Sequence, residues 1–201
     1  MNRQEFEHIV KACANATNGH EFLIIGSQAI LGSVPDAPRE LRVSMELDVC
    51  PLPFTESAAA IIDGNIGELT RFHETFRIYA HAVGPETATL PGDFKDRLVE
   101  LQIGEARVHC LAPMDLAYSK LAAGREKDLE FVVGLLHYRI VRQRELQGLI
   151  EGTSEIKATM EDRLKIATED LNYSFDLILA ADDRIQLALL RQLGQIAAER
   201  A

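Results

Sequence analysis

Residues 41–50 read Leu-Arg-Val-Ser-Met-Glu-Leu-Asp-Val-Cys, and apolar and polar side chains alternate along the whole stretch. Residues two apart on a β-strand point to the same face, so the alternation predicts a strand with one apolar and one polar face. Glu46 and Asp48 share the polar face with Ser44, which sets two carboxylates side by side on a rigid element. The Pro-Leu-Pro sequence that follows ends the strand.

The chain before this strand is predicted to form a helix and then a buried strand. Apolar residues at helical spacing over residues 2–17 indicate an amphipathic helix, which Asn18-Gly19 ends. Residues 21–25 are an apolar run long enough for a buried strand, and Gly26-Ser27 follow directly. A glycine lets the backbone approach a ligand closely, and N–H groups at a helix start can bind phosphate oxygens. The same dipeptide is also typical of a strand-to-helix turn with an N-cap serine.

The chain after the strand is predicted to hold two more regions of strand and then helices. The patterns indicate a helix over 56–68, a strand over 77–83 and a hairpin from 97–103 and 107–111. Further helices are expected over 114–123, 126–144, 155–172 and 182–199. We therefore predict an α/β (α+β) fold in which a mixed sheet is flanked by helices. Its core would span residues 1–137 and a C-terminal helical extension would span 138–201.

Composition sets limits on the function. The chain has 201 residues, 47% of them hydrophobic, which is enough to bury a core, and its net charge of −10 opposes non-specific binding of nucleic acid. Three widely spaced cysteines and the lack of a His-x-His or His-x-x-x-His pair predict neither a disulfide framework nor a zinc site. No apolar run reaches the ~20 residues of a membrane span, and the first residues carry no apolar signal core. We expect a cytoplasmic protein with no membrane partner.

A second charged constellation lies in residues 118–128, Tyr-Ser-Lys-Leu-Ala-Ala-Gly-Arg-Glu-Lys-Asp. A short helix presents Lys120, a turn containing glycine follows, and the next helix begins with charged residues. Lysine and arginine near phosphates neutralise charge that develops during phosphoryl transfer. Acidic residues are also favourable at a helix N-terminus, so Glu126 and Asp128 fit a purely structural role as well.

Taken together, these segments resemble the nucleotidyltransferase superfamily, whose fold is polymerase-beta-like. More narrowly, the chain is similar to uncharacterised bacterial proteins related to abortive-infection and toxin-type nucleotidyltransferases. The segments that carry the resemblance are Phe22–Ile30, Arg42–Val49 and Leu111–Asp128, within a region of roughly residues 5–145. The third is the most specific, because many positions recur at fixed spacing.

The resemblance implies a role for each matching residue. Glu46 and Asp48 would hold Mg²⁺, Lys120 would contact phosphates, and Asp128 would organise the site beside it. The nucleoside triphosphate would be held by four more residues, namely Gly26, Ser27, Ser44 and Arg125. Polymerase-like members carry a third carboxylate on a later strand, for which Glu100 is the candidate. The first metal ligand of the family is aspartate, whereas this chain has Glu46, which is one methylene longer.

Three hypotheses follow for the function. The first is an enzyme that transfers a nucleoside monophosphate from a nucleoside triphosphate to a hydroxyl or phosphate acceptor, RNA among them, with Mg²⁺. The second is a catalytically degenerate member that binds or regulates, which the glutamate at position 46 favours. The third is a partner protein, for example the toxin-like half of a pair held by an antitoxin. An apolar stripe over 185–196 would pack on the core or form a homodimer or partner interface.

Overall fold

The computed structural model of this protein describes residues 1–152 and 156–169. Its α-helices are α1 (Arg3–Thr17), α2 (Ile30–Ser33), α3 (Glu56–Ile66), α4 (Arg71–Phe76), α5 (Pro113–Ala123), α6 (Glu126–His137) and α7 (Gln143–Glu151). Its strands are β1 (Glu21–Ile24), β2 (Glu46–Pro51), β3 (Tyr79–Ala82), β4 (Val99–Ile103) and β5 (Ala106–Cys110). Three short 3₁₀ helices are η1 (Ser27–Ala29), η2 (Arg39–Arg42) and η3 (Phe94–Arg97). Residues 157–169 are also helical.

The five strands form one mixed sheet in the order β3-β2-β1-β5-β4. β1 runs parallel to β5 and β2 runs parallel to β3, whereas β1 with β2 and β4 with β5 are antiparallel. This arrangement confirms the predicted α+β fold with a mixed sheet flanked by helices. It also confirms the predicted hairpin, because β4 and β5 pair across the turn at Gly104-Glu105.

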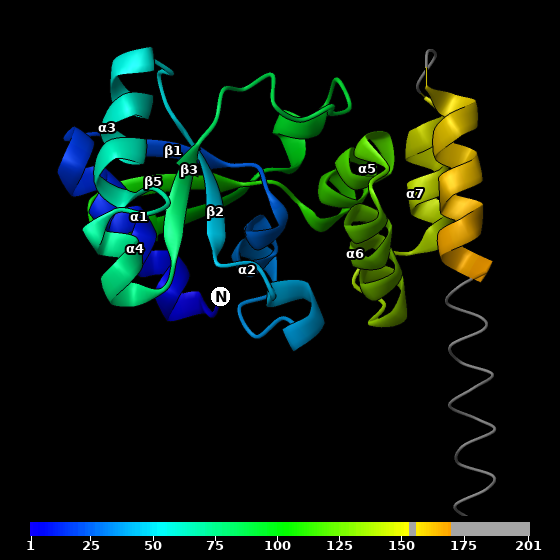
Figure 1. The fold of residues 1–201 in the computed structure, drawn as a ribbon. Coiled ribbons are helices and arrows are strands. Elements are labelled where there is room, and N and C mark those ends of the chain that lie inside the picture. The colour runs from blue at the N-terminus through cyan, green and yellow to red at the C-terminus, as the bar shows by residue number, and fades with distance from the viewer. Residues whose placement is uncertain (153–155, 170–201) are drawn as a thin grey trace, which may run out of the picture.

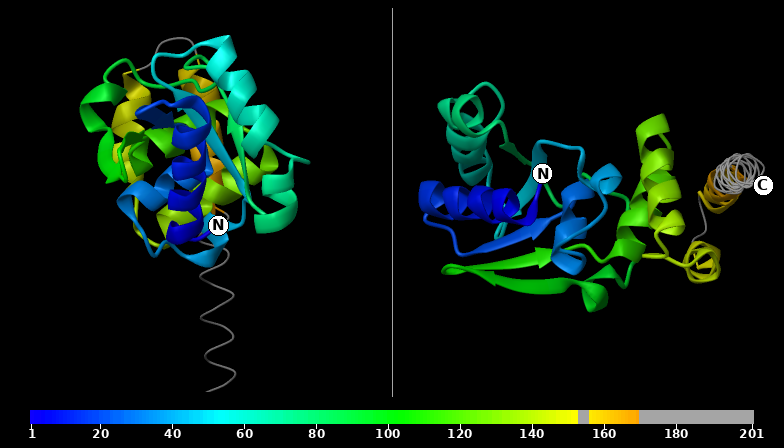
Figure 2. Two further views of the ribbon diagram at one scale, coloured as in Figure 1. Left: turned by 90° about the vertical axis from the view of Figure 1, so that its left-hand side faces the viewer. Right: turned by 90° about the horizontal axis from the view of Figure 1, so that it is seen from below.

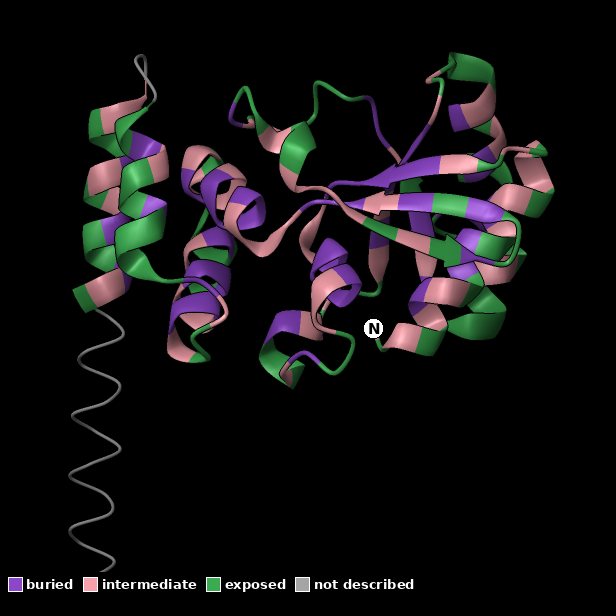
Figure 3. Cartoon of the chain, turned by 180° about the vertical axis from the view of Figure 1, so that it is seen from behind, coloured by how far each residue is buried: buried purple, intermediate pink, exposed green. Residues whose placement is uncertain are grey.

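The two faces of the sheet have different character. Ile24, Val49 and Cys110 share one face by register and are fully buried. α1 and α3 pack against the strands of this sheet (Figures 1 and 3). Glu46 and Asp48 point to the opposite face, because alternate residues of a strand project to opposite sides. A sheet with one packed face leaves its other face free for polar side chains.

The helices after β5 lie beyond the ends of the strands rather than on the covered face (Figures 1 and 2). α5 packs against α6 and α7, and the helix over 157–169 lies outside them. Arg163 in this outer helix donates from Nη1 to the carbonyl oxygens of Leu121 and Ala122, at 2.6 and 2.7 Å. Gly124 follows with φ 68°, and a Cβ there would collide with the Arg163 guanidinium. The extension therefore holds the turn that leads from α5 to α6.

The strand predicted over 41–50 begins only at Glu46. Residues 39–42 form η2, and Val43 and Met45 are 76% and 51% exposed rather than on a buried face. The N-terminal amino group donates to the carbonyls of Arg42 and Ser44, so these groups are not available to a sheet ladder. Ser44 is thus outside the strand, where its Oγ accepts from the Glu46 N–H at 3.0 Å.

Some helices also begin or end at residues other than those predicted from the sequence. The helix predicted over 126–144 ends at His137, since Arg139 takes a left-handed conformation with φ 54°, and α7 starts a new helix at Gln143. α4, whose N-cap is Thr70, was not predicted from the sequence. The predicted helix over 182–199 and its apolar stripe lie outside the described residues. Among the helices of the described part, none has the length and apolar character needed to cross a membrane.

Candidate functional site

The polar end of β2 opens into a cavity of about 820 Å³. It is bounded on one side by the strand ends and on the other by α5 and α6. The residues predicted from the sequence that line it are Gly26, Ser27, Ser44, Glu46, Asp48, Lys120 and Arg125. Segments that are about 100 positions apart in the chain are therefore brought to one place.

The acidic side of the cavity is formed by β2. Glu46 and Asp48 stand two residues apart on the strand, with side chains 35% and 30% exposed. Both carboxylates are therefore accessible from the cavity but held by a rigid element. The Asp48 carbonyl accepts from the Ile25 N–H at 3.3 Å, which ties the end of β1 to this part of β2.

Gly26 is required for space beside Asp48. Its φ of −76° is accessible to any residue, so left-handed backbone is not the reason for glycine. A Cβ at this position would overlap Asp48 Oδ2 and lie 2.6 Å from its Cγ. The Gly-Ser segment after β1 therefore lets the chain pass directly over the carboxylate, and Ser27 lines the cavity next to it.

Substituting Gly26→Ala should displace the Asp48 side chain from its position. We expect affinity for a divalent cation to fall roughly tenfold or more, as for lost positioning around metal ligands, with little loss of folding stability. Titration calorimetry with the cation measures this. Gly92→Ala is the matched control, because nothing lies within 4 Å of a Cβ at Gly92. Unchanged cation affinity in Gly26→Ala would show that this position of Asp48 is not needed.

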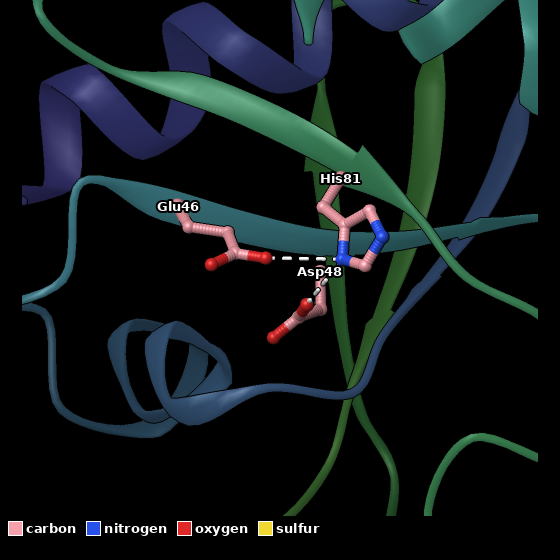
Figure 4. A group of neighbouring side chains, drawn as sticks. All are labelled: Glu46, Asp48 and His81. Atoms are coloured by element: carbon pink, nitrogen blue, oxygen red, sulfur yellow. Dashed lines mark ion pairs between the residues drawn. The ribbon is translucent and has the colours of Figure 1, made fainter. Parts of the chain in front are cut away.

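His81 completes the acidic side, and sequence reasoning missed it. β3 pairs with β2 so that His81 lies opposite Asp48. Its Nδ1 is 3.0 Å from Glu46 Oε1 and 3.4 Å from Asp48 Oδ1 (Figure 4). One ligand atom from each of the three residues falls within 4.8 Å of the others, a grouping that could hold a metal ion. The donors are two carboxylate oxygens and one imidazole nitrogen, which fit a divalent cation.

Tyr79 supports the acidic side from the same strand as His81. Its hydroxyl donates to Glu46 Oε2 at 3.5 Å, while Glu46 Oε1 faces His81. Burial, together with the nearby Glu46 charge, raises the pKa of Tyr79. The two oxygens of Glu46 are therefore oriented by two side chains of β3.

The basic side of the cavity is built around Asp128, which is fully buried at the start of α6. Lys120 Nζ donates to its Oδ1 at 2.8 Å, and Arg125 Nε donates to its Oδ2 at 2.6 Å. Burial raises the pKa of Asp128, but the hydrogen bonds from Arg125 and Lys120 outweigh it, so the pKa is lowered overall. Asp128 thus stands behind the cavity and fixes two cations that line it.

Arg125 faces both Asp128 and the acidic strand. Its pKa is raised by the hydrogen bond to Asp128 first, and the charges of Asp48 and Glu46 add to the effect. The Arg125 side chain is 61% exposed, and Lys127, also on the cavity, is exposed as well. Positive charge from α5 and α6 therefore stands across the cavity from negative charge on β2.

Glu100 does not belong to this site. It lies on β4, three strands from β2, at the far edge of the sheet. Neighbouring strands are spaced by about 4.8 Å, so β4 and β2 lie about 14 Å apart in the sheet. Glu100 is instead 3.7 Å from His109 Nδ1. The structure therefore corrects the expectation that Glu100 supplies a third carboxylate here.

A second buried carboxylate binds the segment that forms another wall of the cavity. Asp115, fully buried at the start of α5, accepts from Arg97 at 2.7 and 3.1 Å, and Asp93 accepts from the same guanidinium. Hydrogen bonds to Asp93 and Asp115 raise the pKa of Arg97. The loop ahead of Arg97 contributes Thr87–Thr89 to the cavity wall. This ion pair therefore fixes one wall of the cavity to α5.

Comparison with protein-family models matches residues 4–178 of the chain to a family described as nucleotidyltransferase of unknown function (DUF6036). The matched region includes β2, β3, α5 and α6, and so all the residues that line the cavity. Comparisons with curated proteins and with solved structures gave no match.

Proposed function

Because the chain belongs to this family of nucleotidyltransferases, we propose that it transfers a nucleoside monophosphate from a nucleoside triphosphate to a hydroxyl or phosphate acceptor. The observation that carries the proposal is the separation of charge across the cavity. Glu46 and Asp48 stand on one wall, and Lys120, Arg125 and Lys127 outnumber the single acid Glu130 on the other. A triphosphate with a divalent cation is a ligand whose two parts match these two walls.

The acidic wall would hold the cation. Glu46 and Asp48 offer the oxygen ligands that Mg²⁺ prefers, and phosphate oxygens and water would complete its shell. When bound, the cation neutralises phosphate charge and polarises the reacting phosphoryl group. The close passage of Gly26 over Asp48 brings Ser27 to the same place, where its hydroxyl can donate to a phosphate oxygen.

The basic wall would bind the phosphates that leave. In the reaction an acceptor oxygen forms a bond to the α-phosphorus, the bond from that phosphorus to the oxygen bridging to the β-phosphate breaks, and pyrophosphate departs. A hydroxyl acceptor also loses its proton, which passes to solvent. Lys120 and Arg125 would stabilise the charge that develops on pyrophosphate, since both are held in place by Asp128. The protein contributes mainly by positioning and by fixed charge.

The acceptor is better sought among small molecules and protein side chains than among long nucleic acids. The chain carries a net charge of −10, which repels a polyanion. The three arginines that stand close together in the sequence, Arg139, Arg142 and Arg144, do not line the cavity. An RNA acceptor, as the resemblance to toxin-type proteins implies, would therefore need a local, positively charged contact surface on this protein.

Titration calorimetry with each nucleoside triphosphate, with and without Mg²⁺, tests the proposal. We expect binding that depends on the cation, and Lys127→Ala should weaken it roughly tenfold, because a charged hydrogen bond to phosphate is lost. Lys11→Ala removes an exposed lysine of α1 outside the cavity and should bind as the wild type does. If none of the nucleoside triphosphates binds, the proposed function is rejected.

A second candidate is a protein that binds nucleotides without turnover. The observation in its favour is that the Lys120 ammonium is already paired with Asp128 at 2.8 Å. Position 46 also holds a glutamate, where the resemblance implies an aspartate. A pyrophosphate-release assay separates the two candidates. Nucleotide binding without release, across hydroxyl-bearing and phosphate-bearing acceptors, would favour this reading and a role with a homodimer or antitoxin partner.

A further inference from the structure

His81 presents one nitrogen to two carboxylates at once. Nδ1 lies 3.0 Å from Glu46 Oε1 and 3.4 Å from Asp48 Oδ1, and the three side chains point toward one another (Figure 4). An imidazole nitrogen carries one hydrogen at most, so it cannot donate a well-directed bond to both oxygens. Three atoms that can each serve as a metal ligand therefore lie within reach of one cation placed between them.

His109 shows what an ordinary ion-paired histidine looks like in the same sheet. It also stands between two carboxylates, but it uses a different nitrogen for each. Nε2 is 2.8 Å from Glu21 and Nδ1 is 3.7 Å from Glu100. His109 bridges two acids, whereas His81 points a single nitrogen at a shared position. Only the arrangement at His81 places two carboxylate oxygens around one nitrogen, which is the grouping that a single metal ion can bind.

The separations at His81 match the edges of a coordination shell. In an octahedral site with ligands about 2.1 Å from the ion, neighbouring ligands are about 3.0 Å apart. The observed 3.0 and 3.4 Å are close to that spacing. Tyr79 donates to Glu46 Oε2 at 3.5 Å, so the Glu46 oxygen that faces His81 remains free for an ion. The His81 side chain is 54% exposed, which leaves the position open to solution.

We propose that Nδ1 of His81 is a third metal ligand and that this site of two carboxylates and one imidazole binds Mn²⁺ more tightly than Mg²⁺. Mg²⁺ selects oxygen ligands, whereas first-row transition metals accept imidazole nitrogen readily. The use of this ion for catalysis rests on the proposed function, but the metal site itself does not. His81 would supply the third ligand for which a carboxylate was expected.

The test uses the full-length protein and the metals themselves. Calorimetry should show Mn²⁺ binding roughly tenfold or more tighter than Mg²⁺. Electron spin echo measurements on the Mn²⁺-loaded protein should show modulation from a directly bound ¹⁴N. His81→Gln should remove that modulation and most of the Mn²⁺ preference. His81→Asp should also remove the modulation, but it should strengthen Mg²⁺ binding, since a third oxygen ligand is restored.

His109→Gln is the matched control and should keep both the modulation and the preference for Mn²⁺. Circular dichroism of each variant checks that the fold is retained. Nitrogen modulation that persists in His81→Gln, or equal affinity of the wild type for Mn²⁺ and Mg²⁺, would overturn the metal assignment. Mn²⁺ bound with the His81 nitrogen but no nucleotide bound would instead leave the assignment intact and remove the proposed function.

Discussion

Replacing Asp48 with asparagine is expected to lower the proposed nucleotidyl transfer by at least about a hundredfold while the protein stays folded. Asp48 lies opposite His81, beside Glu46, and directly under Gly26, so it contacts both β3 and the Gly-Ser segment that follows β1. Asparagine keeps the shape of the side chain but removes its negative charge. The cation and the triphosphate would both lose their main point of attachment.

The stability of this variant should change little. The Asp48 side chain is 30% exposed, and polar substitutions at partly exposed positions usually alter the free energy of unfolding by about 0.5 kcal/mol or less. Pyrophosphate release measures the transfer rate, and urea unfolding measures stability. A loss of transfer without a loss of stability would locate the effect at the site rather than in the fold.

Glu100→Gln is the control for Asp48→Asn. Both substitutions remove one carboxylate, but Glu100 stands at the far edge of the sheet beside His109. Transfer by Glu100→Gln should match the wild type. If the two variants lose transfer equally, the assignment of the cation to β2 is wrong. If Asp48→Asn retains full transfer, the acidic wall has no part in the reaction.

The sequence identified the parts of this site whose chemistry depends on local spacing. Glu46 and Asp48 share a face because a strand has a period of two, and this holds wherever the strand pairs. Lys120 and Asp128 meet because a helix, a glycine turn and a second helix separate them by a fixed number of residues. Such relations need no knowledge of the rest of the fold.

His81 and Glu100 show where this reasoning ends. Both lie on segments that were correctly predicted as strands, but their distance from Asp48 depends on strand order. β3 pairs directly with β2, whereas β4 lies three strands away, and no local pattern encodes that order. The available signal for His81 was a polar residue in the strand that follows the acidic strand along the chain. The register that brings it opposite Asp48 is a tertiary property.

The late start of the polar strand has a similar cause. Val43 and Met45 fit the alternating pattern but are exposed, and the N-terminal amino group donates to the carbonyls of residues 42 and 44 just ahead of the strand. The contact joins residues more than 40 positions apart. A periodic pattern describes what a segment can form, and distant hydrogen bonds decide where the element begins.

Replacing Asp128 with asparagine is expected to destabilise the protein by about 3 kcal/mol. Asp128 is fully buried and accepts from Lys120 at 2.8 Å and from Arg125 at 2.6 Å. Asparagine would leave the 17%-exposed Lys120 without its counter-ion and turn an amide toward it. For a chain of this length each kcal/mol lowers Tm by about 2–4 °C, so a fall of about 6–12 °C is expected in thermal unfolding.

The loss should depend on pH in a defined direction. Hydrogen bonds from Arg125 and Lys120 outweigh burial and hold the pKa of Asp128 below its ordinary value. A lowered folded-state pKa means that the stabilisation is complete above the unfolded pKa of about 3.9 and disappears as pH falls through the folded pKa. The difference in unfolding free energy between wild type and Asp128→Asn should therefore be constant near neutral pH and shrink below about pH 4.

Removing the lysine from the Asp128→Asn variant distinguishes a lost ion pair from a general defect. Lys120→Met takes away the charge that has no partner, so the double variant should unfold at a higher temperature than Asp128→Asn. Glu126→Gln, in the exposed first turn of the same helix, should cost less than about 1 kcal/mol, because it tests only the helix-terminus effect. A double variant no more stable than Asp128→Asn would mean that Asp128 stabilises α6 by capping rather than by holding the two cations of the site.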